Sequence, residues 1–405
     1  MWLALAHASP KQRRLAQNST SMFQNANHYD SIILGGGVIG LSLAWRLAQE
    51  GNKVCVVDRG PIGKEASWAG AGMVPAGPNP SLWPQASTYE QLEGLSQQLH
   101  PKWHQELYEL TRIDTQYQQC GTLHLAADPL QDDSLQKKVA RWLEMGIQCD
   151  ALDAHQIAEL EPALAQQAGK FCSGYFVPEE AQFRSPLYLK ALGAACQIEN
   201  VQWLTGVQVE QFETSGDVLN SVLTDCGAIH ADRFCLATGC WSGQIAQQLG
   251  FELKVHPIRG QIVLLNGPPG LFRHNVYVGM HYFTPRLDGR LLVGSTLEKA
   301  GFHKTTTPQG IAELMDFAAS FAPSTAKLPV KKRWAGLRPG TVDKLPYLGP
   351  IPHLKNAWLA TGHYRAGLQL SPATAVVMGC LLQEKNPPID VSPLSITRSI
   401  DSPAN

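Results

Sequence analysis

The stretch from Asp30 to Asp58 constrains the fold of this chain more than any other part of the sequence. It opens with a compact apolar run at residues 32–34, which predicts a short buried β-strand. After a glycine-rich turn, apolar residues from Leu41 to Gln49 recur at helical spacing, and Lys53–Val57 predicts a second strand that ends at Asp58. Strand, turn, helix, strand and acid therefore follow one another in the order of a βαβ nucleotide-binding unit.

The turn carries the pattern G-x-G-x-x-G at Gly35, Gly37 and Gly40. Gly35 allows a sharp turn, Gly37 allows a pyrophosphate to approach the backbone, and Gly40 allows the helix to pack closely on the strand. The helix N-terminus then presents unpaired N–H groups to the phosphates. A carboxylate at Asp58 accepts hydrogen bonds from ribose hydroxyls and repels a 2′-phosphate, which favours FAD or NAD over NADP. A purely structural glycine turn is the less favoured reading, because all five parts occur in order.

Length and composition limit the classes of function. A chain of 405 residues can bury large cores and predicts two domains. Its 33 Lys+Arg balance 34 Asp+Glu with no basic tract, which argues against nucleic acid as a partner. The nine cysteines are scattered, with no C-x-x-C pair and no His/Cys cluster at zinc spacing, so we expect a reduced compartment and no metal. No window is long and apolar enough to cross a bilayer, so we expect no stable membrane insertion.

The first 28 residues differ from the rest of the chain. No acidic residue precedes Asp30, whereas Lys11, Arg13 and Arg14 are basic. A transit peptide is one interpretation, but a secretory signal is excluded because the short apolar start precedes the charges. We favour a disordered N-terminal extension over residues 1–28, with Met22 as an alternative start, and a cytoplasmic protein.

A second cassette lies near the C-terminus. The run Ala357–Thr361 predicts a strand, and Ser371 as N-cap with Pro372 as the first helical residue predicts the start of a helix. The glycine-bearing loop 362–368 precedes that helix. A helix N-terminus stabilises the negative charge that a reduced flavin carries, and a nicotinamide has no comparable anion, which favours FAD. The β-rich block between the two cassettes indicates interleaved rather than tandem domains.

Six motifs resemble those of one family, the FAD-dependent D-amino acid oxidases and glycine oxidases. They are IILGGGVIG, EASWAGAGM, CLATGCWS, YFTPRLDGRLLVGST, WAGLRPGT and GHYRAGLQLSPATA, in family order over residues 29–385. The similarity is strongest to the glycine oxidase branch that serves thiamine biosynthesis. The resemblance implies a mixed α/β fold with a Rossmann-like FAD-binding domain and an interleaved antiparallel-sheet substrate domain. We expect the FAD domain at residues 29–108, 176–252 and 341–395, and the substrate domain at residues 109–175 and 253–340.

The resemblance also implies site residues. FAD, held without a covalent bond, is expected to contact Gly35, Gly37, Val38, Ile39, Gly40, Asp58, Arg59, Ser67, Ala71, Gly72, Met73, Val207, Gly239, Arg365, Ala366, Gly367, Leu368, Gln369 and Leu370. The substrate is expected to contact Arg338, Tyr282, Arg365 and Leu297. An arginine fork suits an amino acid carboxylate buried beside a flavin, because it is a planar double donor and lysine is not. A structural ion pair at Arg338 and core packing at Tyr282 remain the alternatives.

We therefore expect an oxidase that acts on glycine or a small amine bearing a carboxylate, such as sarcosine. The products are an imine, or glyoxylate and ammonia after hydrolysis, and hydrogen peroxide from oxygen; the imine serves thiamine thiazole synthesis. No residue is assigned as catalytic acid or base, and His363 is given no catalytic proton, because hydride transfer needs only a neutral amine and alignment. The alternatives are a D-amino acid or sarcosine oxidase or dehydrogenase, the oxidase half of a tRNA-modifying enzyme, an NAD-dependent dehydrogenase, and a flavin-binding regulator without turnover. The family implies a homo-oligomer.

Overall fold

A computed structural model describes residues 28–398 of the chain. The expectation of a disordered extension over residues 1–28 therefore falls outside the described residues, except for His28. The helices are α2 Val38–Gln49, α3 Ala66–Ala69, α4 Thr88–Thr111, α5 Pro129–Glu144, α6 Ala154–Leu160, α7 Ser185–Ile198, α8 Ser242–Gln248, α9 Pro308–Phe321 and α10 Gly367–Leu382. None of the described helices is long and apolar enough to cross a membrane.

The first sheet is built around the βαβ unit expected from the sequence. Its strands, in spatial order, are β17 Tyr347–Pro350, β18 Ala357–Thr361, β11 Gly227–Leu236, β1 His28–Leu34, β2 Val54–Asp58 and β8 Gln202–Thr205. The neighbours from β18 to β8 are parallel, and β17 is antiparallel at one edge. Strands β9 Val209–Ser215 and β10 Val218–Thr224 extend β11 as an antiparallel ribbon. This arrangement brings the carboxyl ends of β1 and β2 together, with Gly35 directly after β1 and Asp58 as the last residue of β2.

Apolar side chains cover both faces of this sheet. Every second residue of a strand points to the same face of the sheet. On one face, residues such as Ile33 and Val56 pack in one core with α2, α4, α7 and α10. On the other face, Ile32 and Val57 pack against side chains from β9, β10 and α8. Both faces are buried because parallel strands connected by helices lie inside a layered structure. The continuous apolar runs of β1 and β2 are the sequence signature of that burial.

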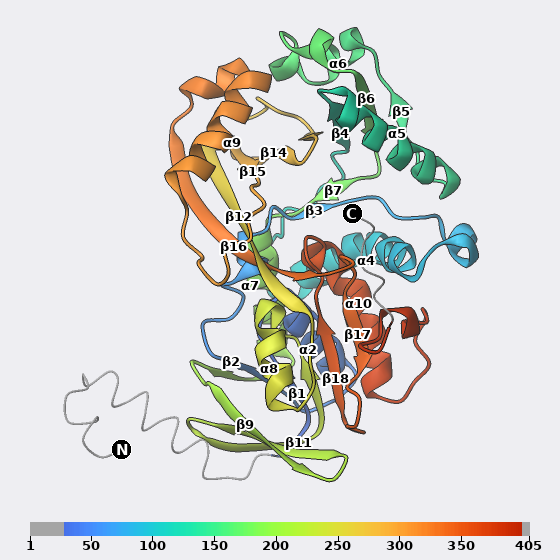
Figure 1. Cartoon of the computed structure of the whole chain (residues 1–405), viewed down its shortest axis with the longest axis vertical. Coiled ribbons are helices and arrows are strands. Elements are labelled where there is room, and N and C mark those ends of the chain that lie inside the picture. Colours follow the sequence, from blue (N-terminus) through green and yellow to red (C-terminus); the bar gives the residue numbers. More distant parts are fainter. Residues whose placement is uncertain (1–27, 399–405) are drawn as a thin grey trace, which may run out of the picture.

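The second sheet is mostly antiparallel and lies in the upper half of Figure 1. Its order is β16 Val330–Thr341, β12 Val255–Asn266, β15 Arg290–Gly294, β14 His281–Pro285, β13 Asn275–Val278, β4 Thr122–Ala126, β6 Ser173–Val177 and β5 Asp150–Ala151. A further pair, β3 Met73–Val74 and β7 Ala181–Gln182, lies between the two sheets (Figure 1). One face of the second sheet packs on α9 and α6, through residues such as Phe283, Leu314 and Ile157.

The two sheets draw on alternating stretches of the chain. The first takes residues 28–58, 202–236 and 347–361, and the second takes residues 122–177 and 255–341. The long strands β12 and β16 run between the two halves of the molecule (Figure 1). The expected fold class, a nucleotide-binding α/β layer with a second, largely antiparallel sheet, is confirmed. The residue boundaries proposed for the two domains stay a prediction.

The predicted start of the C-terminal helix is wrong. Helix α10 begins at Gly367, so Ser371 is not its N-cap and Pro372 lies inside it. A proline there cannot donate to the carbonyl one turn earlier. The hydroxyl of Ser371 donates to that carbonyl, Leu368 O, at 3.0 Å. Helix α4 satisfies two further groups, since Ser96 Oγ accepts from Ala373 N at 3.4 Å and His100 Nε2 lies 2.8 Å from Gln369 O.

Candidate cofactor and substrate site

A cavity of about 630 Å³ lies between the two sheets and receives residues from both. From the first layer it is lined by the β1–α2 turn, the ends of β2 and β11, and the start of α10; from the second it is lined by β12, β14 and β16. The volume falls in the range of small-molecule and cofactor sites. The lining divides into a nucleotide end near Asp58, a middle bordered by loop 66–73 and α10, and a substrate end near Arg338.

At the nucleotide end, close packing leaves no room for side chains. Gly35 has φ +107°, and a Cβ there would lie 2.4 Å from Ala237 O. A Cβ on Gly40 would lie 1.9 Å from Gly35 O, so the first turn of α2 can sit against the strand end only because residue 40 is glycine. At the N-terminus of α2, Gly37 provides no side-chain cap; Ser67 Oγ accepts from Val38 N at 2.9 Å, which leaves the N–H groups of residues 39 and 40 for a ligand. Unpaired N–H groups at a helix N-terminus suit a pyrophosphate.

Asp58 lies at the tip of β2 and lines the cavity. Its Oδ2 accepts from Gly36 N at 2.8 Å, and its Oδ1 accepts from Gly60 N at 2.8 Å. Each oxygen keeps a lone pair for a ribose hydroxyl. Beside it, the Arg59 guanidinium lies 3.9 Å from the centre of the Trp241 ring, and both residues line the cavity. This end therefore offers an acceptor for ribose and a flat cationic and aromatic surface for a purine.

Loop 66–73 borders the middle of the cavity and is held by buried polar groups. Gly72 has φ +80°, and a Cβ there would lie 2.2 Å from Phe183 O. Arg286, which is 9 % exposed, donates to Ala71 O, to Phe183 O at 3.1 Å and to Gln182 Oε1 at 2.8 Å. Burial lowers the pKa of Arg286 to about 10, so the side chain stays charged at neutral pH. The loop is thus fixed from the hairpin β14–β15.

The start of α10 closes the middle of the cavity from the opposite side. No side chain caps its N-terminus at Ala366, so the first N–H groups point toward the cavity without a partner from a cap. Such an end stabilises a developing negative charge. His363, just before it, is buried with Nε2 3.0 Å from Thr374 Oγ1, and burial lowers its pKa to about 3. His363 is therefore neutral at physiological pH.

At the substrate end, Arg338 presents an unpaired positive charge. Its Nη2 donates to Ser295 Oγ at 2.7 Å and its Nη1 to Thr296 O at 3.3 Å. Within residues 28–398, no carboxylate forms an ion pair with Arg338, so the alternative of a structural ion pair is not found. Burial lowers the pKa of Arg338, and the like charge of Arg365 lowers it further. An anion bound here would relieve both effects.

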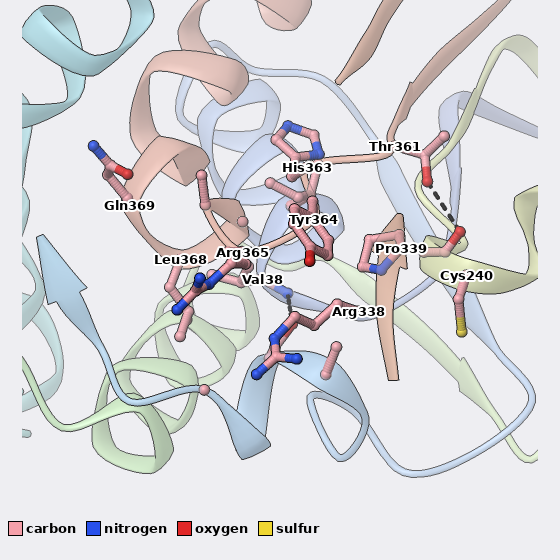
Figure 2. A pocket seen from close by; sticks show the side chains of 18 of the residues that line it. Val38, Cys240, Arg338, Pro339, Thr361, His363, Tyr364, Arg365, Leu368 and Gln369 are labelled. Carbon is pink, nitrogen blue, oxygen red and sulfur yellow. Dashed lines mark hydrogen bonds between the residues drawn. The ribbon is translucent and has the colours of Figure 1, made fainter. Parts of the chain in front are cut away.

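Two other predicted substrate residues lie next to Arg338. Figure 2 shows the guanidinium groups of Arg338 and Arg365 pointing into the same space, with the Tyr364 hydroxyl above them. Tyr282 is 4 % exposed and lines the cavity, and its ring makes an edge contact with Tyr277 at 5.8 Å between centroids. Two cations and three phenols, from Arg338, Arg365, Tyr277, Tyr282 and Tyr364, thus line this end of the cavity.

Of the residues predicted from the sequence, most line this cavity and three do not. Gly40 and Leu370 lie behind the lining, in contact with the protein core. Leu297 is 53 % exposed and lies outside the lining. Its neighbours Thr296 and Glu298 hydrogen-bond with Gln261, whereas the Leu297 side chain itself is left in solvent. The expected contact between Leu297 and the substrate is therefore not seen.

Several lining residues were not predicted. They include Tyr277, Ser295, Trp241, Gly260, Glu93 and Lys138. Trp241, Ser295 and Tyr277 were within reach of the sequence, since the first two fall inside the motifs that carry the family resemblance and Tyr277 lies just before one of them. Gly260, Glu93 and Lys138 line the cavity only through long-range packing of β12, α4 and α5, for which local patterns carry no signal. In the described part of the chain, no group of three His, Cys, Asp or Glu side chains could hold a metal ion.

The residues present fit FAD. The open N-terminus of α2 and Asp58 suit the pyrophosphate and ribose of an adenosine dinucleotide. The second uncapped helix N-terminus, at α10, lies on the same cavity and suits the polar edge of a flavin.

Comparisons with known proteins agree with this geometry. Residues 30–381 match the family model described as FAD dependent oxidoreductase (DAO). The chain is 35% identical to a glycine oxidase of Pseudomonas aeruginosa over 364 residues, covering 89% of this chain and 97% of that one. It is 32% identical to a bifunctional protein ThiO/ThiG of Trichormus variabilis, covering 89% of this chain and 54% of that one. The crystal structure of glycine oxidase from Geobacillus kaustophilus superposes with a TM-score of 0.87 at 30% identity, covering 92% and 100% of the two chains.

Proposed function

We propose a reaction for this chain from the premise that it belongs to the family of FAD-dependent oxidoreductases, whose model spans residues 30–381. The chain binds FAD and oxidises glycine to its imine, and oxygen takes up the electrons as hydrogen peroxide. Similarity to glycine oxidases of Pseudomonas aeruginosa and Geobacillus kaustophilus supports glycine as the substrate.

One observation carries the proposal. The Arg338 guanidinium lines the cavity beside the start of α10, without an ion pair from the described residues. Two of its five N–H donors are used by Ser295 and Thr296, which leaves three for a ligand. A planar donor set of this kind binds a carboxylate through two parallel hydrogen bonds. The lack of a protein carboxylate there points to a carboxylate on the substrate.

The chain's own residues bind and orient the substrate. Arg338 holds the carboxylate, and Arg365 adds a second positive charge to the same space. Tyr282 packs against the substrate from the second sheet, with Tyr277 at its edge. Bound FAD supplies a hydride acceptor. His363, neutral and hydrogen-bonded to Thr374, takes no proton from the substrate, whose amine reacts in its neutral form.

A secondary amine or a larger amino acid is the second candidate. Beyond Tyr277 the cavity continues between α4 and α5, where it is lined by Glu93, Lys138 and Trp142. This extension has room for an N-substituent or side chain that glycine does not use. Sarcosine and D-amino acids are the substrates that this space favours.

The proposal extends to the role of the product. The chain is 32% identical to the ThiO/ThiG protein of Trichormus variabilis, and the motif resemblance points to the same use of the imine, as a precursor of the thiamine thiazole. We further propose a homo-oligomer that works in the cytoplasm. Light scattering of the purified protein and fractionation of cells test these two points.

Aerobic assay of the purified holoprotein tests the reaction. Glycine, sarcosine and D-alanine are each titrated while peroxide, glyoxylate or pyruvate, and ammonia or methylamine are measured. Glycine should give peroxide and glyoxylate in equal amounts, with a kcat/KM at least equal to that of sarcosine. If only D-alanine yields peroxide, the chain is a D-amino acid oxidase and the proposed substrate is wrong. If none of the three substrates yields peroxide, the proposed reaction is refuted.

A further inference from the structure

Three neighbouring strands of the second sheet carry glycine on the face that borders the cavity. They are Gly336 on β16, Gly260 on β12 and Gly294 on β15. Gly260 is paired with Gly336, and Gly294 is paired with Ile262, two residues along the same face. We call these three residues the glycine floor. None has a positive φ, so the backbone itself would accept another residue at each position.

The groups that lie on the glycine floor exclude side chains from it. A Cβ on Gly260 would lie 2.1 Å from Arg338 Nη2 and 2.3 Å from Arg338 Cζ. A Cβ on Gly294 would lie 2.5 Å from both Cζ and Oη of Tyr282. The Arg338 guanidinium and the Tyr282 phenol therefore lie flat on the sheet, each directly over a glycine. These are the two side chains proposed to hold the substrate from this sheet.

The register of the sheet explains how Arg338 reaches Gly260. Arg338 is paired with Ile258, and Gly260 is the next residue on the same face of the neighbouring strand. Such diagonal neighbours are within reach of a long side chain. With glycine at position 260, the side chain can cross the strand in contact with its backbone.

A hydrogen-bonded segment fixes the edge of the same guanidinium. Ser295 Oγ and Thr296 O accept from Nη2 and Nη1 of Arg338. Thr296 Oγ1 in turn accepts from Gln261 N at 3.0 Å and donates to Glu298 Oε1. Arg259 and Glu298 are joined by two backbone hydrogen bonds, of 2.9 and 3.0 Å, and by an ion pair. The face of the guanidinium rests on Gly260 while its edge is tied to residues 295–296.

We propose that Gly260 and Gly294 are positioning residues that set how far Arg338 and Tyr282 stand above the sheet, and hence the depth of the carboxylate site. This inference rests on the proposed function. Ordinary contact with a Cβ begins at about 3.4 Å, so a methyl group at position 260 lifts the guanidinium by about 1 Å. A misplacement of about 1 Å costs on the order of 100-fold in activity when a group positions a reactant. Gly260 acts through Arg338 and is a positioning residue.

The test uses the holoprotein with Gly260→Ala, Arg338→Ala and the double variant. Acetate is the probe, and its binding to the oxidised flavoprotein is followed by the change in flavin absorbance, which needs no turnover. FAD content, melting temperature, and KM and kcat for glycine are measured alongside. Gly169→Ala is the matched control, because a Cβ on Gly169 would meet no atom within 4 Å and the residue has no positive φ.

Gly260→Ala should keep FAD, weaken acetate at least tenfold and raise the KM for glycine by a similar factor, whereas Gly169→Ala changes neither. Arg338→Ala should abolish acetate binding by itself, and the effect of Gly260→Ala on melting temperature should disappear in the Arg338→Ala background, because the overlying guanidinium is gone. If Gly260→Ala binds acetate as the unmodified protein does, or if its loss of stability persists in the Arg338→Ala background, the proposed role of Gly260 is refuted. If the unmodified protein binds no acetate, both the carboxylate site at Arg338 and the proposed role of Gly260 are refuted. If acetate behaves as expected but glycine is not oxidised, only the proposed substrate fails.

Discussion

Replacing Arg338 by lysine should weaken substrate binding without releasing FAD. In the structure two of the five guanidinium donors bind Ser295 and Thr296, and three remain for a ligand. Lysine carries three donors on a single atom and cannot form the planar fork. Keeping both protein contacts would leave it one donor for the carboxylate, so at least one charge-assisted hydrogen bond is lost.

Such a hydrogen bond contributes about 1.5–3 kcal/mol, and each 1.4 kcal/mol is about tenfold in affinity. The kcat/KM for glycine should therefore fall about 10- to 150-fold, mainly through KM, and acetate should bind more weakly by a similar factor. Steady-state kinetics and acetate titration of the flavin absorbance measure both. Arg333→Lys, on the exposed part of the same strand, is the control. A kcat/KM within twofold of the unmodified value in Arg338→Lys would refute the carboxylate fork.

Three further changes test other parts of the account. Asp58→Asn should weaken FAD binding at least tenfold, because a neutral amide replaces the carboxylate that accepts from Gly36 N, Gly60 N and the ribose. FAD titration of the apoprotein measures this affinity, with the exposed Asp316→Asn as control, and equal affinities of the Asp58→Asn and unmodified proteins would contradict it. Arg286→Lys should lower the free energy of unfolding by roughly 1–3 kcal/mol, since a single ammonium cannot occupy the places of both Nη1 and Nη2 and at least one buried acceptor among Ala71 O, Phe183 O and Gln182 loses its donor. Chemical denaturation detects this, and an unchanged midpoint rules it out. Arg141 lowers the pKa of Glu90 to about 2. The unmodified protein should therefore be more stable than Glu90→Gln by its full margin above pH about 4.5, and this margin should vanish as the pH falls toward 2. Chemical denaturation across this pH range measures the difference, and a difference that does not depend on pH would show that the ion pair contributes nothing.

The sequence predicted the elements whose signals are local. The first βαβ unit follows from its glycine spacing and apolar runs. The starts of two further helices also carry local signals: Ser87 and Glu90 form the capping box of α4, and Pro308 follows the N-cap Thr307 at the start of α9. In each case the residues that determine the element lie within a few positions of it.

The predictions that failed depended on partners far away in the chain. Helix α10 continues back to Gly367 although Pro372 cannot donate to Leu368 O, and Ser96 and His100 of α4 hydrogen-bond the neighbouring groups Ala373 N and Gln369 O. Leu297 is exposed beside Glu298, which pairs with Arg259 on β12. The short strand β8 was missed since its four residues are ordered by pairing with β2 at the sheet edge.

The candidate site shows the same division. The nucleotide end could be assigned from one contiguous segment, whereas the substrate end could be assigned only by family resemblance. Gly260 was not singled out, because a glycine within a strand gives no sign of the arginine that lies on it. Only the register of β12 against β16 brings the two together.

Anaerobic titration of the purified holoprotein with glycine shows whether the bound flavin takes electrons from this substrate. We expect bound FAD whose oxidised absorbance is lost as glycine is added, about one glycine per flavin, because flavin accepts two electrons. Admission of oxygen should restore the absorbance and yield one peroxide per flavin. Protein that carries FAD but keeps its oxidised spectrum in saturating glycine, sarcosine and D-alanine would contradict the account.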